Sequence, residues 1–180
     1  MNTYIALLRG INVGGKNKLP MKTLIQLLET LGAKSVQSYI QSGNIVFQHE
    51  CADTDDLSRH ISSAIDESQG FRPAVLVITR NRLERAITSN PFPHAVTEPK
   101  KLHIYFLVEV PPAPNLEKLE ALRSETESFE LVKDHFYLHA PDGIGRSKLA
   151  AKAENLLDVV ATARNWRTVS KLQSMSSDPR

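Results

Sequence analysis

The chain has 180 residues, of which 41% are hydrophobic and 23% are charged, and its formal net charge at pH 7 is +2. This composition is ordinary for a soluble globular protein of one domain or two small ones. No apolar run comes near the roughly 20 residues that a membrane helix needs. The N-terminus lacks the pattern of a secretory signal, and a single cysteine excludes an internal disulfide. These features predict a cytoplasmic protein with no membrane association.

The charges are distributed unevenly along the chain. Residues 1–28, 143–153 and 159–177 contain Lys or Arg and no acid, while acids gather at residues 50–67 and 109–134. Such segregation can give a nearly neutral protein a positive face. Solvated faces of different sign explain the pattern equally well, so charge alone does not identify a binding surface.

The first half of the chain predicts the order strand, helix, strand, strand, helix, strand, helix. Apolar residues recur at helical spacing, or in short strand-like runs, between turn signals. Gly32 and Gly70 are natural helix ends, and Thr79 can cap the last helix. The expected elements are strands at 3–8, 36–40, 45–47 and 74–78 and helices at about 20–31, at 54–69 and after 79.

The second half of the chain repeats this order. The alternation of Phe136, Leu138 and Ala140 predicts a strand with one buried face. Ser147 can cap one helix, and Asn165 can cap a final basic helix. The expected elements are strands at 102–108, 129–132, 136–140 and 159–163 and helices near 116–122, after 147 and after 165.

Each half is therefore a βαββαβ unit with an extra helix. This order is typical of an antiparallel four-stranded sheet with two helices on one face, the ferredoxin-like plait. We predict an α+β protein with two ferredoxin-like subdomains, at residues 1–92 and 101–180. The halves share element order and not residues, so a duplication is inferred from topology alone.

The segment Arg9–Lys18 contains three glycines and three cations. Bare backbone amides and cations together can hold an anion, most often a phosphate. The spacing from Gly10 to Lys16 matches a P-loop, but Asn17 stands where a P-loop has the Ser or Thr that binds Mg²⁺. The following helix also begins late. We predict an anion-binding loop of another kind, with a solvated glycine-rich connection as the alternative. The expected contributors are Arg9, Asn12, Gly14, Gly15, Lys16, Asn17 and Lys18.

Two further segments are candidates for the same anion site. The run Arg146-Ser147-Lys148 enters a helix, where cations oppose the helix dipole unless an anion is bound. Arg164 and Arg167, with Asn165 between them, are one helical turn apart and can grip one phosphate. Ordinary capped helices with solvated cations are the alternative in both cases. The turn at 41–44 adds two minor candidates, Ser42 and Asn44.

No pattern of histidines or cysteines predicts a metal site, and none predicts a cofactor. His135 and His139 lie on a predicted strand, where four residues separate them by about 13 Å. Cys51 has no neighbouring base in sequence, and no Gly-x-Ser-x-Gly elbow is present. The strand with Tyr105 and Phe106 lacks the surrounding aromatic signature of an RNA-binding sheet.

Four motifs together resemble those of a bacterial family. They are LRGINVGGKNK at 8–18, YIQSGNIVF at 39–47, GIGRSKL at 143–149 and ARNWRTVSKL at 163–172. The set resembles the family called domain of unknown function 1697 over almost the whole chain. The resemblance implies two ferredoxin-like subdomains in a soluble bacterial protein, and it implies no activity and no catalytic residue.

Three functions stay open from the sequence. The first is binding of a phosphate-bearing ligand, either a nucleotide or a nucleic acid, because basic acid-free segments lie beside glycine-bearing loops. The second is an enzyme acting on a small phosphorylated metabolite, although no acid or base is tied to these loops in sequence. The third is a protein-interaction module that contacts an acidic partner. The sequence assigns neither a catalytic residue nor an oligomeric state.

Overall fold

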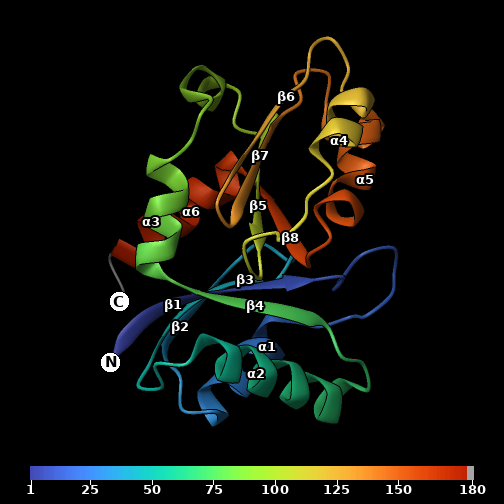
Figure 1. Ribbon diagram of the computed structural model, residues 1–180. Helices are drawn as coiled ribbons and strands as arrows, with labels where there is room; N and C mark the ends of the chain where they lie inside the picture. Colours follow the sequence, from blue (N-terminus) through green and yellow to red (C-terminus); the bar gives the residue numbers. More distant parts are fainter. Residues whose placement is uncertain (178–180) are drawn as a thin grey trace. The chain divides into compact units, whose positions relative to one another are not determined.

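The computed structural model describes residues 1–177 (Figure 1). The chain divides into two compact units. The first unit is Met1–Glu84 together with the segment that starts at Ser170, and the second unit is Arg85–Val169. The boundaries therefore fall inside two helices, α3 (Arg80–Thr88) and α6 (Trp166–Ser177).

The first unit contains a four-stranded antiparallel sheet with the strand order β2-β3-β1-β4. Two helices cover one face of this sheet (Figure 1). That face and the helices share one buried apolar cluster, which includes Tyr4, Leu24, Phe47 and Ile61. The elements are β1 (Asn2–Arg9), α1 (Met21–Thr30), β2 (Lys34–Tyr39), β3 (Asn44–His49), α2 (Thr54–Gln69) and β4 (Ala74–Thr79).

Helix α2 illustrates how local sequence positions these elements. Asp53 is the N-cap, and its Oδ1 accepts hydrogen bonds from the backbone N–H groups of Asp55 and Asp56. The negative charges of these acids in the first turn also interact favourably with the partial positive charge of the helix N-terminus. Gly70 ends the helix in the left-handed conformation, with φ of 75°. The apolar stripe between these ends is buried against the sheet.

The second unit has the same architecture, with the antiparallel strand order β6-β7-β5-β8. Its sheet and helices α4 and α5 bury a second apolar cluster, which includes Tyr105, Leu119, Phe136 and Leu149. The elements are β5 (Leu102–Leu107), α4 (Leu116–Leu122), β6 (Ser128–Val132), β7 (His135–His139), α5 (Lys148–Leu157) and β8 (Ala161–Asn165), with short 3₁₀ turns at Pro93–Thr97 and Ile144–Arg146.

The predicted α+β fold of two antiparallel sheets, each with helices on one face, is confirmed. The three predicted caps are also confirmed. The backbone N–H of Arg82 donates to Oγ1 of Thr79, that of Ala150 to Oγ of Ser147, and that of Thr168 to Oδ1 of Asn165.

The expected strand at 159–163 begins two residues later than predicted, at Ala161. Asp158 ends α5 in the left-handed conformation, with φ of 57°, so the chain turns there without a glycine. Val159 and Val160 then serve as the connection, and the strand continues through Asn165.

Candidate functional site

The glycine-rich segment Arg9–Lys18 forms a small hairpin after β1. Val13 and Lys16 pair as an antiparallel bridge, and Gly14 and Gly15 between them have φ of 58° and 74°. Positive φ at both central residues is typical of a type I′ turn. The two glycines therefore form an exposed hairpin tip. A P-loop differs, because its glycines wrap an anion at the start of a helix.

The two asparagines of this loop bind the loop's own backbone. Asn12 accepts from the N–H of Leu19 (2.8 Å) and donates to the carbonyls of Leu19 and Gln41 (both 2.9 Å). Asn17 donates to the carbonyl of Gly10 (2.9 Å). Both asparagines have positive φ, 53° and 50°. Their side chains thus stabilise a strained loop, while the exposed Lys16 and Lys18 extend into solvent.

The turn between β2 and β3 packs against this hairpin. Asn44 is fully buried and donates from Nδ2 to the carbonyl of Tyr39 (3.2 Å) and to Oγ of Ser42 (3.1 Å). Leu8 donates its N–H to the carbonyl of Gly43 (2.8 Å). The structure therefore brings Ser42 and Asn44 next to the glycine-rich segment, and it gives Asn44 a role in closing the turn.

Arg146, Ser147 and Lys148 lie together in a pocket of the second unit, with a volume of about 490 Å³. We call it the polar pocket. One wall comes from the end of α4 and its connection to β6, and the other comes from the connection between β7 and α5. Its lining residues are Ala121, Leu122, Arg123, Ser124, Glu127, Asp142, Gly143, Arg146, Ser147 and Lys148.

The cations of the polar pocket differ in their partners. Arg123 donates to Oε1 of Glu120 (2.7 Å) and to the carbonyl of Glu127 (2.9 Å). The hydrogen bond from Arg123 to Glu120 raises the pKa of the guanidinium. Arg146 and Lys148 are exposed, and within residues 1–177 neither forms an ion pair with a carboxylate. Neither of these two positive charges is therefore neutralised by a direct ion pair.

Two carboxylates that the sequence did not tie to these loops also line the polar pocket. Glu127 is buried, at 5% exposure, and its Oε2 accepts from the backbone N–H of Ser124 (3.0 Å). Asp142 accepts from Oγ1 of Thr126 (2.6 Å). Glu127 comes from a distant connection, so only the folded sheet brings it near Arg146. The sequence did contain a signal that Asp142 lies near this site, because Asp142 directly precedes Gly143.

The expectation that Arg164 and Arg167 lie one helical turn apart on the same helix is wrong. Arg164 lies in β8 opposite Ile104, and Arg167 lies in the first turn of α6. The cause is that the strand continues to Asn165, whose side chain then caps the helix. Burial lowers the pKa of Arg164 to about 10, so the guanidinium stays charged at neutral pH, and its Nη1 donates to the carbonyl of Ala163 (2.9 Å).

The predicted contributors thus fall into separate groups. The hairpin at 9–18 and the turn with Ser42 and Asn44 belong to the first unit, and the other segments belong to the second. Neither Arg164 nor Arg167 is among the residues that line the polar pocket. One anion site shared by all three basic segments stays a prediction.

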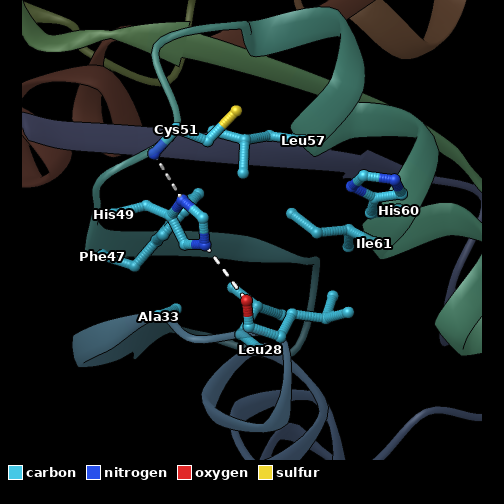
Figure 2. A pocket seen from close by; sticks show the side chains of 9 residues that line it. Leu28, Ala33, Phe47, His49, Cys51, Leu57, His60 and Ile61 are labelled. Carbon is cyan, nitrogen blue, oxygen red and sulfur yellow. Dashed lines mark hydrogen bonds between the residues drawn. The ribbon is translucent and has the colours of Figure 1, made fainter.

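The first unit has an apolar pocket of about 280 Å³ (Figure 2). His49 bridges two backbone groups at its wall: Nδ1 accepts from the N–H of Cys51 (2.9 Å), and Nε2 donates to the carbonyl of Leu31 (3.0 Å). Sequence reasoning missed this pocket, since its apolar residues read as ordinary core. Its lining residues are Leu28, Leu31, Ala33, Phe47, His49, Cys51, Leu57, His60 and Ile61.

Across residues 1–177, no group of three or more His, Cys, Asp or Glu side chains is arranged to hold a metal ion. His135 and His139 both lie in β7, at the two ends of the strand. In the same stretch of chain, every helix is too short or too polar to cross a bilayer.

Comparisons with known proteins agree with the fold. The model of a family described as "Protein of unknown function (DUF1697)" matches residues 1–137, so the resemblance to this family is confirmed. The motifs at 8–18 and 39–47 lie within the matched residues, and those at 143–149 and 163–172 lie beyond them. The solved structure of the conserved bacterial protein SP0830 from Streptococcus pneumoniae matches with a TM-score of 0.75 and 23% sequence identity, covering 97% of this chain and 98% of that chain. At this identity the likeness shows the fold alone. No curated protein matches the chain significantly.

Proposed function

Because the chain belongs to the DUF1697 family, whose description names no activity, we propose its function from its own site. The protein binds a phosphate-bearing small molecule in the polar pocket of the second unit. Arg146, Lys148 and the first amides of α5 hold the phosphate. The observation that carries this proposal is a pair of cations, neither in a direct ion pair, at the start of a ten-residue helix that lines a pocket.

The start of α5 is electrostatically unfavourable without an anion. A helix N-terminus carries a partial positive charge, which disfavours nearby cations. The first turn of α5 has no acid and begins with Lys148, whereas the first turn of α2 carries Asp55 and Asp56. A phosphate at this end offsets both the helix dipole and the two cations.

The composition of the polar pocket favours a small molecule over a nucleic acid. Its volume lies within the roughly 300–1,000 Å³ that is usual for ligand sites. A nucleic acid would bring successive phosphates against Glu127 and Asp142 on the same lining, whereas a small molecule can place its single phosphate at Arg146 and Lys148. The same carboxylates can accept hydrogen bonds from ligand hydroxyl or amino groups. A sugar phosphate or a nucleoside monophosphate combines these features.

Titration calorimetry with inorganic phosphate, sugar phosphates and nucleoside monophosphates tests the proposal, after thermal-shift screening selects a ligand. Arg146→Gln and Lys148→Gln should each weaken binding about tenfold, because each removes a charged hydrogen bond. Lys152→Gln is the matched control, since it removes the same charge one turn later in α5. The proposal fails if no phosphate compound binds, or if Lys152→Gln weakens binding equally.

A second candidate function is hydrolysis or transfer at the bound phosphate, for which the two carboxylates are the specific observation. Asp142 is exposed beside the cations and is the better general base, since Glu127 is buried and bonded to a backbone amide. Phosphate release from the selected ligand should then be lost in Asp142→Asn, with affinity changed little. If wild-type protein binds the ligand without turnover, the binding function stands and the enzymatic one falls.

A further inference from the structure

The apolar pocket of the first unit occupies the same topological position as the polar pocket of the second. Residues of the apolar pocket come from α1 and its connection to β2, from β3 and its connection to α2, and from α2 itself. Those of the polar pocket come from α4 and its connection to β6, from the connection between β7 and α5, and from the first residue of α5. One position in the repeated fold thus has a charged lining in one unit and an apolar lining in the other.

We propose that the apolar pocket is a second binding site, for a compact uncharged apolar group the size of a fused bicyclic ring. Its walls are core side chains: Leu28, Leu57 and Ile61 are 1%, 5% and 2% exposed. Two small side chains, Ala33 and Cys51, leave room where larger ones would close the pocket. Figure 2 shows Leu57, Ile61 and Leu28 facing the space that His49 and Cys51 border.

The volume of the pocket sets the size of the ligand. A dry apolar cavity of roughly 150 Å³ in a protein core is enough to bind benzene. The apolar pocket has about 280 Å³, close to twice that volume. Two fused rings, as in indole, therefore fit it, whereas a nucleotide or a long acyl chain does not.

The polar groups of His49 and Cys51 at the wall are already satisfied, which favours an uncharged ligand on that side of the pocket. Both ring nitrogens of His49 are hydrogen-bonded to backbone groups. The carbonyl of Cys51 accepts from the hydroxyl of Tyr4 (2.7 Å), and its thiol donates to the carbonyl of Asp53 (3.7 Å). Ligand polar atoms placed against His49 or Cys51 would therefore lose their hydration without replacement, at a cost in affinity.

The charge next to the pocket disfavours anions in particular. Asp53, Asp55 and Asp56 form the cap and first turn of α2, immediately before the lining residue Leu57. The ion pair of Arg59 with Asp56 offsets one of these charges, and the N-terminus of α2 offsets part of the remainder. A carboxylate on the ligand would lie close to like charges, which disfavour its binding. This feature distinguishes the site from a fatty-acid site and from the polar pocket.

Cys51 provides the readout, because it is the single cysteine of the chain and is half-buried on the pocket wall. Its alkylation by iodoacetamide is followed by mass spectrometry, with indole as the probe and indole-3-acetate as its anionic counterpart. At about four times its Kd, indole should slow alkylation about fivefold, since only the unoccupied fraction reacts, and it should raise the melting temperature. Indole-3-acetate should protect much less at the same concentration.

Two variants fill the pocket from the connection between α1 and β2, Ala33→Leu and Leu31→Phe. Ala52→Leu is the control beside Cys51 and outside the lining. At least one filling variant that folds should lose the melting-temperature rise with indole, while Ala52→Leu keeps it. The proposal is overturned if indole neither protects Cys51 nor raises the melting temperature, or if the folded filling variants respond as the wild type does. Stronger protection by indole-3-acetate would overturn the preference for an uncharged ligand.

Discussion

At the scale of single residues, Gly43 shows how a turn constrains the chain. It has φ of 74°, and a Cβ at this position would lie 2.5 Å from Cβ of Leu8. Gly43→Ala should therefore lower the free energy of unfolding by about 2–4 kcal/mol, from backbone strain together with the clash. Urea denaturation followed by circular dichroism measures the loss.

Gly14 supplies the control for this prediction. It also has positive φ, 58°, but a Cβ there meets no atom within 4 Å. Gly14→Ala should cost about 1 kcal/mol, from the backbone alone. Equal losses in the two variants would show that the contact with Leu8 is relieved by a small shift and does not restrict position 43.

The same scale shows where sequence reasoning about the site succeeded and failed. The glycines and asparagines of the segment 9–18 were noticed because their residue types are unusual beside a strand. Their hydrogen-bond partners were not predictable from the sequence. Asn12, for example, donates to the carbonyl of Gln41, which is 29 residues away and comes close only when the sheet has formed. An amide that binds a ligand and an amide that binds its own loop have the same sequence signature.

At the scale of the elements, local signals predicted most of the structure. Caps such as Ser147 act within three residues, so the sequence contains both partners of the hydrogen bond. Arg164 was misplaced because β8 is a short edge strand whose register depends on its pairing with β5. Where pairing with a neighbouring strand determines the ends of a strand, hydrophobic periodicity over five residues is too weak to predict those ends.

Helix α5 gives a prediction in which stability and binding change in opposite directions. Lys148 is its first residue and opposes the helix dipole. Lys148→Glu should raise the free energy of unfolding by about 0.5–1 kcal/mol at low salt, because an acid in the first turn is favourable. The same change should abolish binding of the phosphate ligand. Thermal denaturation and calorimetry on one preparation measure both effects.

The control for this prediction is Lys152→Glu, one turn further along α5, where the effect of the dipole is weaker. It should leave both stability and binding nearly unchanged. A loss of stability in Lys148→Glu would instead show that the lysine makes a structural contribution, and that the unfavourable charge invoked for the anion site is absent.

At the scale of the whole molecule, the sequence predicted the repeated βαββαβ order because each half encodes it in local patterns. It did not predict the pockets, because each is lined from connections that are distant in sequence. Ala33 and Cys51 are separated by a full hairpin, as are Glu127 and Arg146. The strand orders explain why the pockets correspond, since the same two connections meet in both sheets.

Two buried histidines make the stability of the folded chain depend on pH. Burial lowers the pKa of His103, and burial together with the charge of His94 lowers that of His139. Both side chains have a ring nitrogen without a hydrogen-bond partner among residues 1–177. The unfolded chain therefore binds protons more readily than the folded one. The contribution of the two neutral histidines to the free energy of unfolding should be fully present above the ordinary histidine pKa of about 6.5. It should fall as the pH drops below that value.

Urea denaturation at pH 7.5 and at pH 5.5 measures this dependence. The wild type should lose free energy of unfolding at the lower pH, and His103→Gln should lose less, because glutamine does not take up a proton. His60→Gln is the control, since His60 is exposed on α2 and should leave the pH dependence unchanged. A wild-type stability that rises on acidification would mean that folding favours the protonated histidines, and the assignment of burial as the dominant cause would be wrong.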